Sequence, residues 1–175
     1  ELPVYRVDLE GLNEQPLNIQ WAGSLGYLEE LLTAQGWRPA PAVGAASIMN
    51  WLVSDPEISS LPILPQVHDG QHHDLLMVNR SEAAERLTVL RLWPANAEIS
   101  DSGRQLWTGT VSYLTIDHTI PLITSLSTGK EFDAPLIEIS SILADRAATM
   151  MVTRAPPYAG ETGWDGQVLL AWQRP

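Results

Sequence analysis

The sequence predicts an α+β fold: one domain over residues 1–175, with a mixed, mostly antiparallel sheet and about three helices packed on it. Segments of strand composition gather in the middle of the chain instead of alternating with helical segments. Two of them, Leu87–Trp93 and Leu106–Leu114, have no purely polar face, which is typical of strands inside a sheet that is covered on both sides. A length of 175 residues suits a single domain with a sizeable core.

These two strands form the predicted centre of the sheet. Leu, Val, Thr, Trp and Tyr dominate both, and such residues favour strands. Because side chains alternate along a strand, Arg91 and Trp93 share one face of the first strand. In the second strand, Trp107 and Thr108 point to opposite faces. The polar residues 95–104 predict a hairpin connection between them. We expect both strands to be largely buried.

The first third of the chain predicts two strands and two helices. Tyr5–Leu12 alternates weakly, as an edge strand does, and Leu17–Trp21 alternates apolar and polar residues cleanly. Ser24 is a candidate N-cap, since leucines follow it at helical spacing, and Gly36 is placed to end that helix. A second helix is expected over Ala42–Val53.

A tight hairpin is predicted at Asp69-Gly70, a dipeptide typical of two-residue β-turns. The two prolines of Leu61–Gln66 keep the preceding segment extended and confine it to an edge or to a place outside the ladder. His73–Asn79 follows as an apolar strand. These segments add a hairpin and one more strand to the sheet.

The C-terminal part predicts a helix followed by two strands. The helix is expected over Asp133–Arg146, with a hydrophobic staple between Phe132 and Ile137 at its start. Thr149–Arg154 and Gln167–Gln173 then have strand composition.

Composition excludes several classes of protein. The chain has no cysteine, which rules out a disulfide scaffold and thiolate chemistry. Its formal net charge of −11 repels nucleic acid, so we expect no nucleic-acid partner. No apolar run reaches the roughly 18 residues that a membrane-spanning helix needs, so no direct bilayer span is expected. The seven tryptophans either fill a core or offer a surface on which a ligand stacks.

Three histidines, His68, His72 and His73, lie around the predicted Asp69-Gly70 turn. Three imidazoles suit a divalent metal. A two-residue turn pairs His68 with Gln71, however, so that His68 and His73 share a face while His72 points to the other. At most two imidazoles then come together, and two make an incomplete metal site. We therefore expect no bound metal.

Motifs for catalysis are absent from the sequence. Ala22–Gly26 (AGSLG) lacks the first glycine of a nucleophile elbow, and Ser127–Lys130 (STGK) lacks the upstream glycine of a phosphate-binding loop. His118, beside Asp117, is an acid–base candidate or a third metal ligand. We assign no catalytic residue and expect no cofactor.

Six strings spread over the chain occur together in one protein family. They are Pro16–Pro41 (PLNIQWAGSLGYLEELLTAQGWRPAP), Leu61–His72 (LPILPQVHDGQH), Leu87–Pro94 (LTVLRLWP), Leu106–Ser112 (LWTGTVS), Phe132–Leu136 (FDAPL) and Trp164–Ala171 (WDGQVLLA). In this order they resemble the LssY C-terminal domain of bacteria, from about Pro3 onward. The resemblance implies a bacterial parent in which this domain follows a DedA-type module, a lipid-phosphate phosphatase module or simple hydrophobic anchors.

The chain begins at Glu1, and we expect it to be a soluble piece excised from such a membrane-anchored parent. The resemblance then implies a place in the bacterial cell envelope, tethered to the inner membrane. The periplasmic side is favoured because lipid-phosphate phosphatase sites usually face it. The membrane module of its own parent is the expected partner.

The candidate ligand or partner surface combines histidines with residues of the strings that resemble the family. Its members are His68, Asp69, Arg91, Trp93, Trp107 and His118.

Three functions fit these observations. A non-catalytic accessory domain that binds a ligand or partner is favoured, because the catalytic motifs are absent and the resemblance implies a membrane context. The alternatives are a metal-assisted hydrolase of unrecognised type using His68 and His118, and a structural domain that self-associates through exposed tryptophans.

Overall fold

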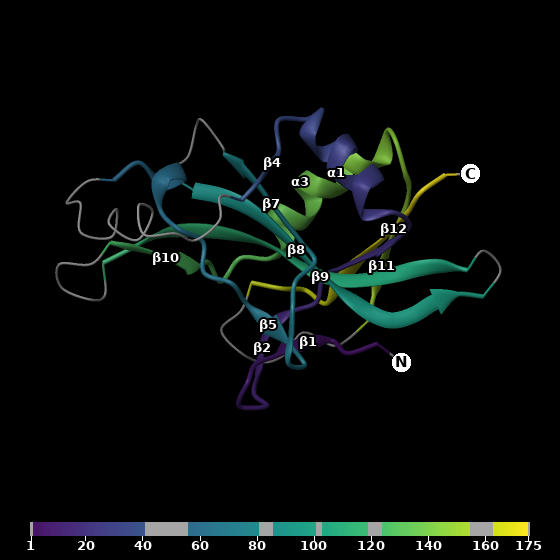
Figure 1. Ribbon diagram of the computed structural model, residues 1–175, viewed down its shortest axis with the longest axis horizontal. Helices are drawn as coiled ribbons and strands as arrows, with labels where there is room; N and C mark the ends of the chain where they lie inside the picture. Colours follow the sequence, from purple (N-terminus) through teal and green to yellow (C-terminus); the bar gives the residue numbers. More distant parts are fainter. Residues whose placement is uncertain are drawn as a thin grey trace.

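The chain folds around an eight-stranded mixed sheet (Figure 1). The computed structural model describes residues 2–40, 56–80, 86–100, 103–118, 124–154 and 163–174. Strands follow the order β11-β12-β3-β9-β8-β7-β4, and β10 also pairs with β9. Their bounds are β3 Ile19–Ala22, β4 Arg38–Pro39, β7 Leu75–Arg80, β8 Arg86–Ile99, β9 Arg104–Asp117, β10 Ser125–Thr128, β11 Ala148–Thr153 and β12 Gln167–Trp172. Only the β12–β3 pair among these is parallel, which confirms a mixed, mostly antiparallel sheet.

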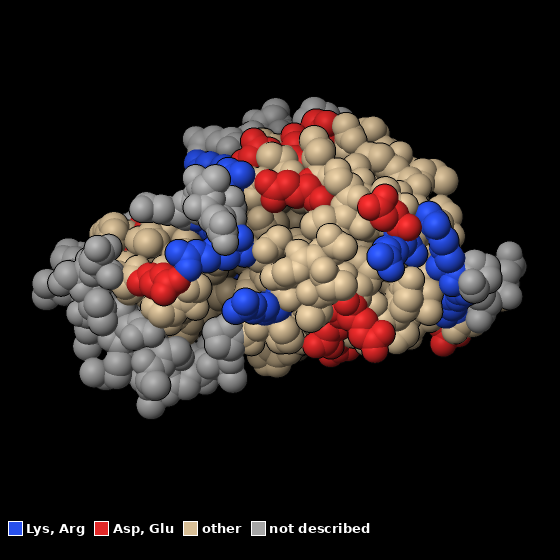
Figure 2. Space-filling view, turned by 90° about the horizontal axis from the view of Figure 1, so that it is seen from above, with Lys and Arg blue, Asp and Glu red and all other residues tan. Residues whose placement is uncertain are grey.

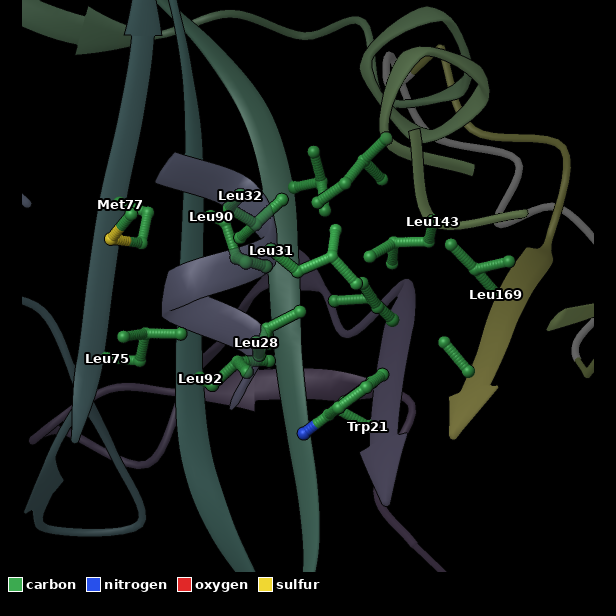
Figure 3. Packing of buried hydrophobic residues seen from close by; sticks show 14 of the residues in the cluster. Trp21, Leu28, Leu31, Leu32, Leu75, Met77, Leu90, Leu92, Leu143 and Leu169 are labelled. Atoms are coloured by element: carbon green, nitrogen blue, oxygen red, sulfur yellow. The ribbon is translucent and has the colours of Figure 1, made fainter. Parts of the chain in front are cut away.

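Two helices cover one face of the sheet, α1 (Leu25–Thr33) and α3 (Asp133–Ala144). Leu28, Leu31 and Leu32 of α1 point onto the strands, where they meet Leu90 and Leu92 of β8 (Figure 3). Burial of these leucines against apolar strand residues is the main stabilising term on this face. The view onto this side shows acidic and basic side chains interspersed over the surface (Figure 2).

The ends of α1 follow the sequence signals. Ser24 Oγ accepts a hydrogen bond of 3.4 Å from the Tyr27 N–H, which confirms the predicted N-cap. Gly36 follows the helix at φ +86°, a backbone angle that a glycine adopts without strain.

Two small hairpins cover part of the opposite face of the sheet (Figure 1). They are β1 (Tyr5–Val7) with β2 (Asn13–Pro16), and β5 (Val67–His68) with β6 (Gln71–His72). Beside them, Ile58 of the 3₁₀ turn η2 (Ile58–Ser60) and Ile63 pack on apolar residues of β8 and β9. Residues 87–93 and 108–114 are buried throughout, so the central strand pair is covered on both faces as expected.

Some expectations need correction. The described residues contain two α-helices, α1 and α3, where about three were expected, and the helix expected over Ala42–Val53 lies outside the described residues. The staple between Phe132 and Ile137 is wrong. Phe132 packs with Trp164 instead, and Ile137 is 61% exposed. The first turn of α3 is capped by Glu131, whose Oε1 accepts the N–H of Asp133 at 2.9 Å.

Strands β2, β4 and β10 were not predicted. Each has two to four residues, and without a longer apolar alternation the sequence gives little strand signal. The N-terminal strand is also shorter than expected, because the chain turns back after Val7 and returns as β2.

Asn18 completes the edge of β9 between two shorter neighbours. Strand β3 pairs with residues 106–109 and β10 with residues 114–117. In the gap, Asn18 Nδ2 donates to the Val111 carbonyl at 3.0 Å, and the Val111 N–H donates to Asn18 Oδ1 at 2.7 Å. The fully buried amide thus satisfies both backbone groups of Val111, as a neighbouring strand would.

Gly109 lets β8 and β9 approach closely where Leu92 pairs with it. A Cβ atom at this position would lie 2.0 Å from the carbonyl oxygen of Arg91. Real Cβ atoms do not tolerate that separation, so any side chain here forces the two central strands apart.

We therefore predict that Gly109→Ala lowers the unfolding free energy by about 3 kcal/mol, the upper end for overpacking in a core. Urea denaturation measures the change. Gly129→Ala is the matched control, because a Cβ there meets its nearest neighbour at an ordinary 3.6 Å. Equal stability of the two variants would contradict the close approach of β8 and β9.

Candidate functional site

The face of β8–β9 that is turned away from the helices carries buried polar side chains. Arg91 is paired with Thr110 across the two strands, and Trp93 is paired with Thr108. Ser112 lies on the same face, opposite Val89. All four polar residues and the indole are at most 1% exposed. This set, Arg91, Trp93, Thr108, Thr110 and Ser112, is called the polar cluster below.

Arg91 is the charged centre of the polar cluster. Its Nε and Nη1 are buried and have no hydrogen-bond partner among the described residues. Burial, together with the smaller effect of the positive charge of Arg6, lowers the pKa of the guanidinium to about 10. Arg6 itself forms an ion pair with Glu14 and donates to the Val67 carbonyl. Glu14 is therefore the counter-ion of Arg6 and not of Arg91.

Other side chains of the polar cluster also have buried polar atoms without hydrogen-bond partners. The indole Nε1 of Trp93 and the hydroxyl oxygens of Thr108, Thr110 and Ser112 are buried without hydrogen-bond partners in the described part of the chain. Most buried polar groups in proteins are hydrogen-bonded, so several orphaned groups on one sheet face need an explanation. They mark a place where the described residues leave several hydrogen-bonding groups without partners.

The β5–β6 hairpin brings two histidines against this cluster. Val67 pairs with His72 and His68 with Gln71, and Gly70 has φ +74°, which confirms the predicted turn and register. The rings of His68 and His73 both meet Trp93 edge-on, with centroids 5.9 Å and 6.2 Å away. His72 is exposed.

Hydrogen bonds fix the state of the buried imidazole of His68. The Val7 N–H donates to His68 Nδ1 at 3.2 Å, which requires an unprotonated Nδ1. Burial lowers the pKa of His68, Asp69 raises it, and the nearby Arg6 lowers it. Burial likewise lowers the pKa of His73, whose Nδ1 lies 3.4 Å from the Gln66 carbonyl oxygen.

A cavity of about 90 Å³ lies beside the polar cluster. It is lined by Pro3, His68, Asp69, Gln71, Pro94, Ala95, Asn96 and Thr108. The volume gives room for a few waters or a small polyatomic ion. Thr108 connects the two features, because it lines the cavity and belongs to the polar cluster.

A larger hollow of about 660 Å³ lies near Arg38, Glu57 and Arg80. Arg80 and Glu57 form an ion pair there, and both are well exposed to solvent. One of the unpaired buried donors of the polar cluster, Thr108, lines the smaller cavity, and none lines the larger hollow, so we place the candidate site at the polar cluster.

The structure brings three of the six sequence candidates together and places one at the rim. His68, Arg91 and Trp93 meet at the polar cluster, and exposed Asp69 lines the adjoining cavity. Trp107 lies on the helix-covered face, where its Nε1 donates to the Gly23 carbonyl at 3.1 Å. His118 is exposed just beyond the end of β9.

His68 and His118 do not share a site. Thr108, which lines the cavity with His68, precedes His118 by ten residues of nearly continuous strand, which corresponds to about 30 Å. Among the residues that the structure describes, no three side chains of His, Asp or Glu gather as metal ligands would.

Sequence reasoning missed Arg6 and the three hydroxyl residues of the cluster. The alternation of Thr108, Thr110 and Ser112 on the face that also carries Arg91 was visible, and the pairing of the two strands could have linked them. Arg6 gave no such signal, because it comes from a short strand far away in sequence.

Comparison with known proteins gives one match. The model of a family described as LssY C-terminus matches residues 1–131. No curated protein and no solved structure matches the chain significantly. The matched residues include the whole polar cluster, Arg6, and both small hairpins.

The lowered pKa of His68 predicts a loss of stability in mild acid. Below about pH 6.5, the ordinary pKa of histidine, the unfolded chain binds a proton at this position more readily than the folded chain does. The unfolding free energy should therefore fall as the pH decreases from 7.5 to 5.0. In His68→Asn, whose amide oxygen can still accept from Val7, this fall should be smaller.

Urea denaturation of both proteins at the two pH values measures the difference. His72→Asn, which changes an exposed histidine of the same hairpin, should keep the full pH dependence of the unmodified chain. A dependence that is reduced in His72→Asn but not in His68→Asn would contradict the buried, neutral state of His68.

Proposed function

The chain belongs to the LssY C-terminus family, and from this premise we propose that it is a non-catalytic accessory domain that binds a ligand through its polar cluster. In this proposal residues 1–175 form one soluble domain of a bacterial envelope protein. The domain lies on the periplasmic side of the inner membrane, beside the membrane module of its parent chain. No helix in the described part of the chain is long and apolar enough to cross a bilayer.

The observation that carries the proposal is the buried guanidinium of Arg91 with two unpaired N–H groups. Removing a charge from water costs several kcal/mol unless a counter-charge and hydrogen bonds replace the water. Arg91 forms no ion pair with any of the described carboxylates, and Arg6 adds a repulsive positive charge. A group that binds at this point would offset a cost that the described residues leave uncompensated.

The contacts of His68 favour binding over catalysis. A general base needs a free lone pair that faces the substrate. His68 uses its Nδ1 lone pair to accept the Val7 N–H, so the proton of the neutral ring is on Nε2 and no lone pair is free. The hydrolase alternative also needs His68 and His118 in one site, and these lie at different places along β9.

Self-association through tryptophans has little support from burial. Every tryptophan that the structure describes is buried or half-buried. Trp21, Trp37 and Trp93 are the largest fully buried side chains of the described residues. These indoles fill the interior, and a stacking surface of exposed rings is not available among them.

Thermal unfolding in the presence of small molecules tests the proposal. A panel of neutral sugars, polyamines, carboxylates and phosphate esters should contain compounds that raise the Tm, and Arg91→Met should abolish the rise. Arg146→Met is the matched control, because it removes an exposed arginine. A ligand at ten times its dissociation constant adds about 1.4 kcal/mol of stability, or about 3–6 °C in Tm.

Mass spectrometry of each stabilising compound after incubation separates binding from catalysis. Recovery of the unchanged compound supports an accessory role. Conversion of the compound by the unmodified chain but not by Arg91→Met would establish an enzyme and overturn the proposal. A panel without any Arg91-dependent stabilisation would also overturn it.

A further inference from the structure

We propose that the polar cluster and its cavity form an oxyanion site, in which Arg91 binds a phosphate, sulfate or carboxylate group. This inference rests on the proposed function and names the chemical class of the ligand. It follows from the kinds of hydrogen-bonding groups that remain unpaired and from the charge of the cluster.

The unpaired groups of the cluster are donors. Arg91 Nε, Arg91 Nη1 and Trp93 Nε1 can only donate, and the hydroxyls of Thr108, Thr110 and Ser112 can each donate one proton. Sulfate and carboxylate ions only accept hydrogen bonds, and the charged oxygens of a phosphate group do the same. A guanidinium presents neighbouring N–H groups in a planar fork, which fits two oxygens of one anion.

The charge of the cluster points to the same ligand. Arg91 carries a positive charge, and the Arg6 charge that acts on it is neutralised by Glu14. Two buried amide oxygens on the covering segments, of Gln15 and Gln66, also lack partners. They are neutral and do not offset a full charge, whereas an anion does.

The cavity limits the size of the ligand. Thr108 lines it, and Arg91 and Thr110 lie one step further along the same face of the strand pair. Exposed Asp69 lines the cavity, and solvent screens its carboxylate. A space of about 90 Å³ admits a single small anionic group, either free in solution or at the end of a lipid headgroup.

Thermal unfolding in sodium phosphate, sodium sulfate and sodium acetate tests this site, with sodium chloride at equal ionic strength as the reference. At ten times its dissociation constant, an oxyanion should raise the Tm of the unmodified chain by about 3–6 °C. Phosphate and sulfate also stabilise proteins by exclusion from their surface. The proposal therefore requires that Arg91→Met loses the rise, while Arg146→Met keeps it.

Two further variants sharpen the result. Arg91→Lys keeps the charge without the planar fork and should retain only part of the rise. Thr110→Val removes one hydroxyl with little change in shape, so it reduces the rise and serves as the test if Arg91→Met does not fold. An equal rise in the unmodified chain, Arg91→Met and Thr110→Val would overturn the oxyanion site.

The outcomes distinguish this inference from the proposed function. If neutral or cationic compounds of the panel stabilise the chain through Arg91 and the three oxyanions do not, the oxyanion site fails and the accessory binding role stands. If no compound acts through Arg91, both fail.

Vesicles identify the source of the anion. Phosphatidylcholine vesicles that contain dihexadecyl phosphate should retain the unmodified chain but not Arg91→Met if the site takes a lipid phosphate. Stabilisation by inorganic phosphate without vesicle binding assigns the site to a soluble anion. Either result supports an oxyanion site, and binding to the vesicles that is equal in both proteins counts against it.

Discussion

Burial of both faces of the β8–β9 strand pair is the constraint on which the rest of the structure depends. A strand pair without a solvent-exposed face needs one cover on each side, and water does not satisfy its polar side chains. The helices α1 and α3 supply one cover by apolar packing. On the other side, the two small hairpins and the segment around Ile58 lie against the sheet, so that polar residues of the strands become buried.

The buried polar side chains on the two faces of the central strands differ in their charged partners. On the helix-covered face, the Tyr113 hydroxyl and the Thr88 hydroxyl both donate to Glu138 of α3, and Arg86 stacks over the Tyr113 ring. On the opposite face, Arg91 has no such carboxylate among the described residues. A carboxylate serves the buried polar side chains of the central strands on one side, and a fully buried guanidinium lacks one on the other, which indicates a binding role for the second side.

Residue patterns predicted the parts of the fold that depend on local chemistry. The Ser24 cap, the Asp69-Gly70 turn and the apolar character of β8 and β9 each follow from neighbouring residues, and the structure confirms them. The cluster could be predicted only in part, because Arg6 comes near Arg91 and His68 meets Trp93 through tertiary packing between distant segments. The role of Asn18 was equally hidden, since nothing local marks its amide as a substitute for a strand.

The proposed binding role depends most on what satisfies the N–H groups of Arg91. Diffraction from crystals soaked in sodium selenate measures this directly, because selenium gives an anomalous signal that water and chloride do not imitate at its absorption edge. If Arg91 binds an oxyanion, an anomalous peak is expected beside the guanidinium, with selenate oxygens within hydrogen-bond distance of Nε and Nη1. Arg91 fully hydrogen-bonded to protein groups or waters, with no peak at saturating selenate, would contradict it.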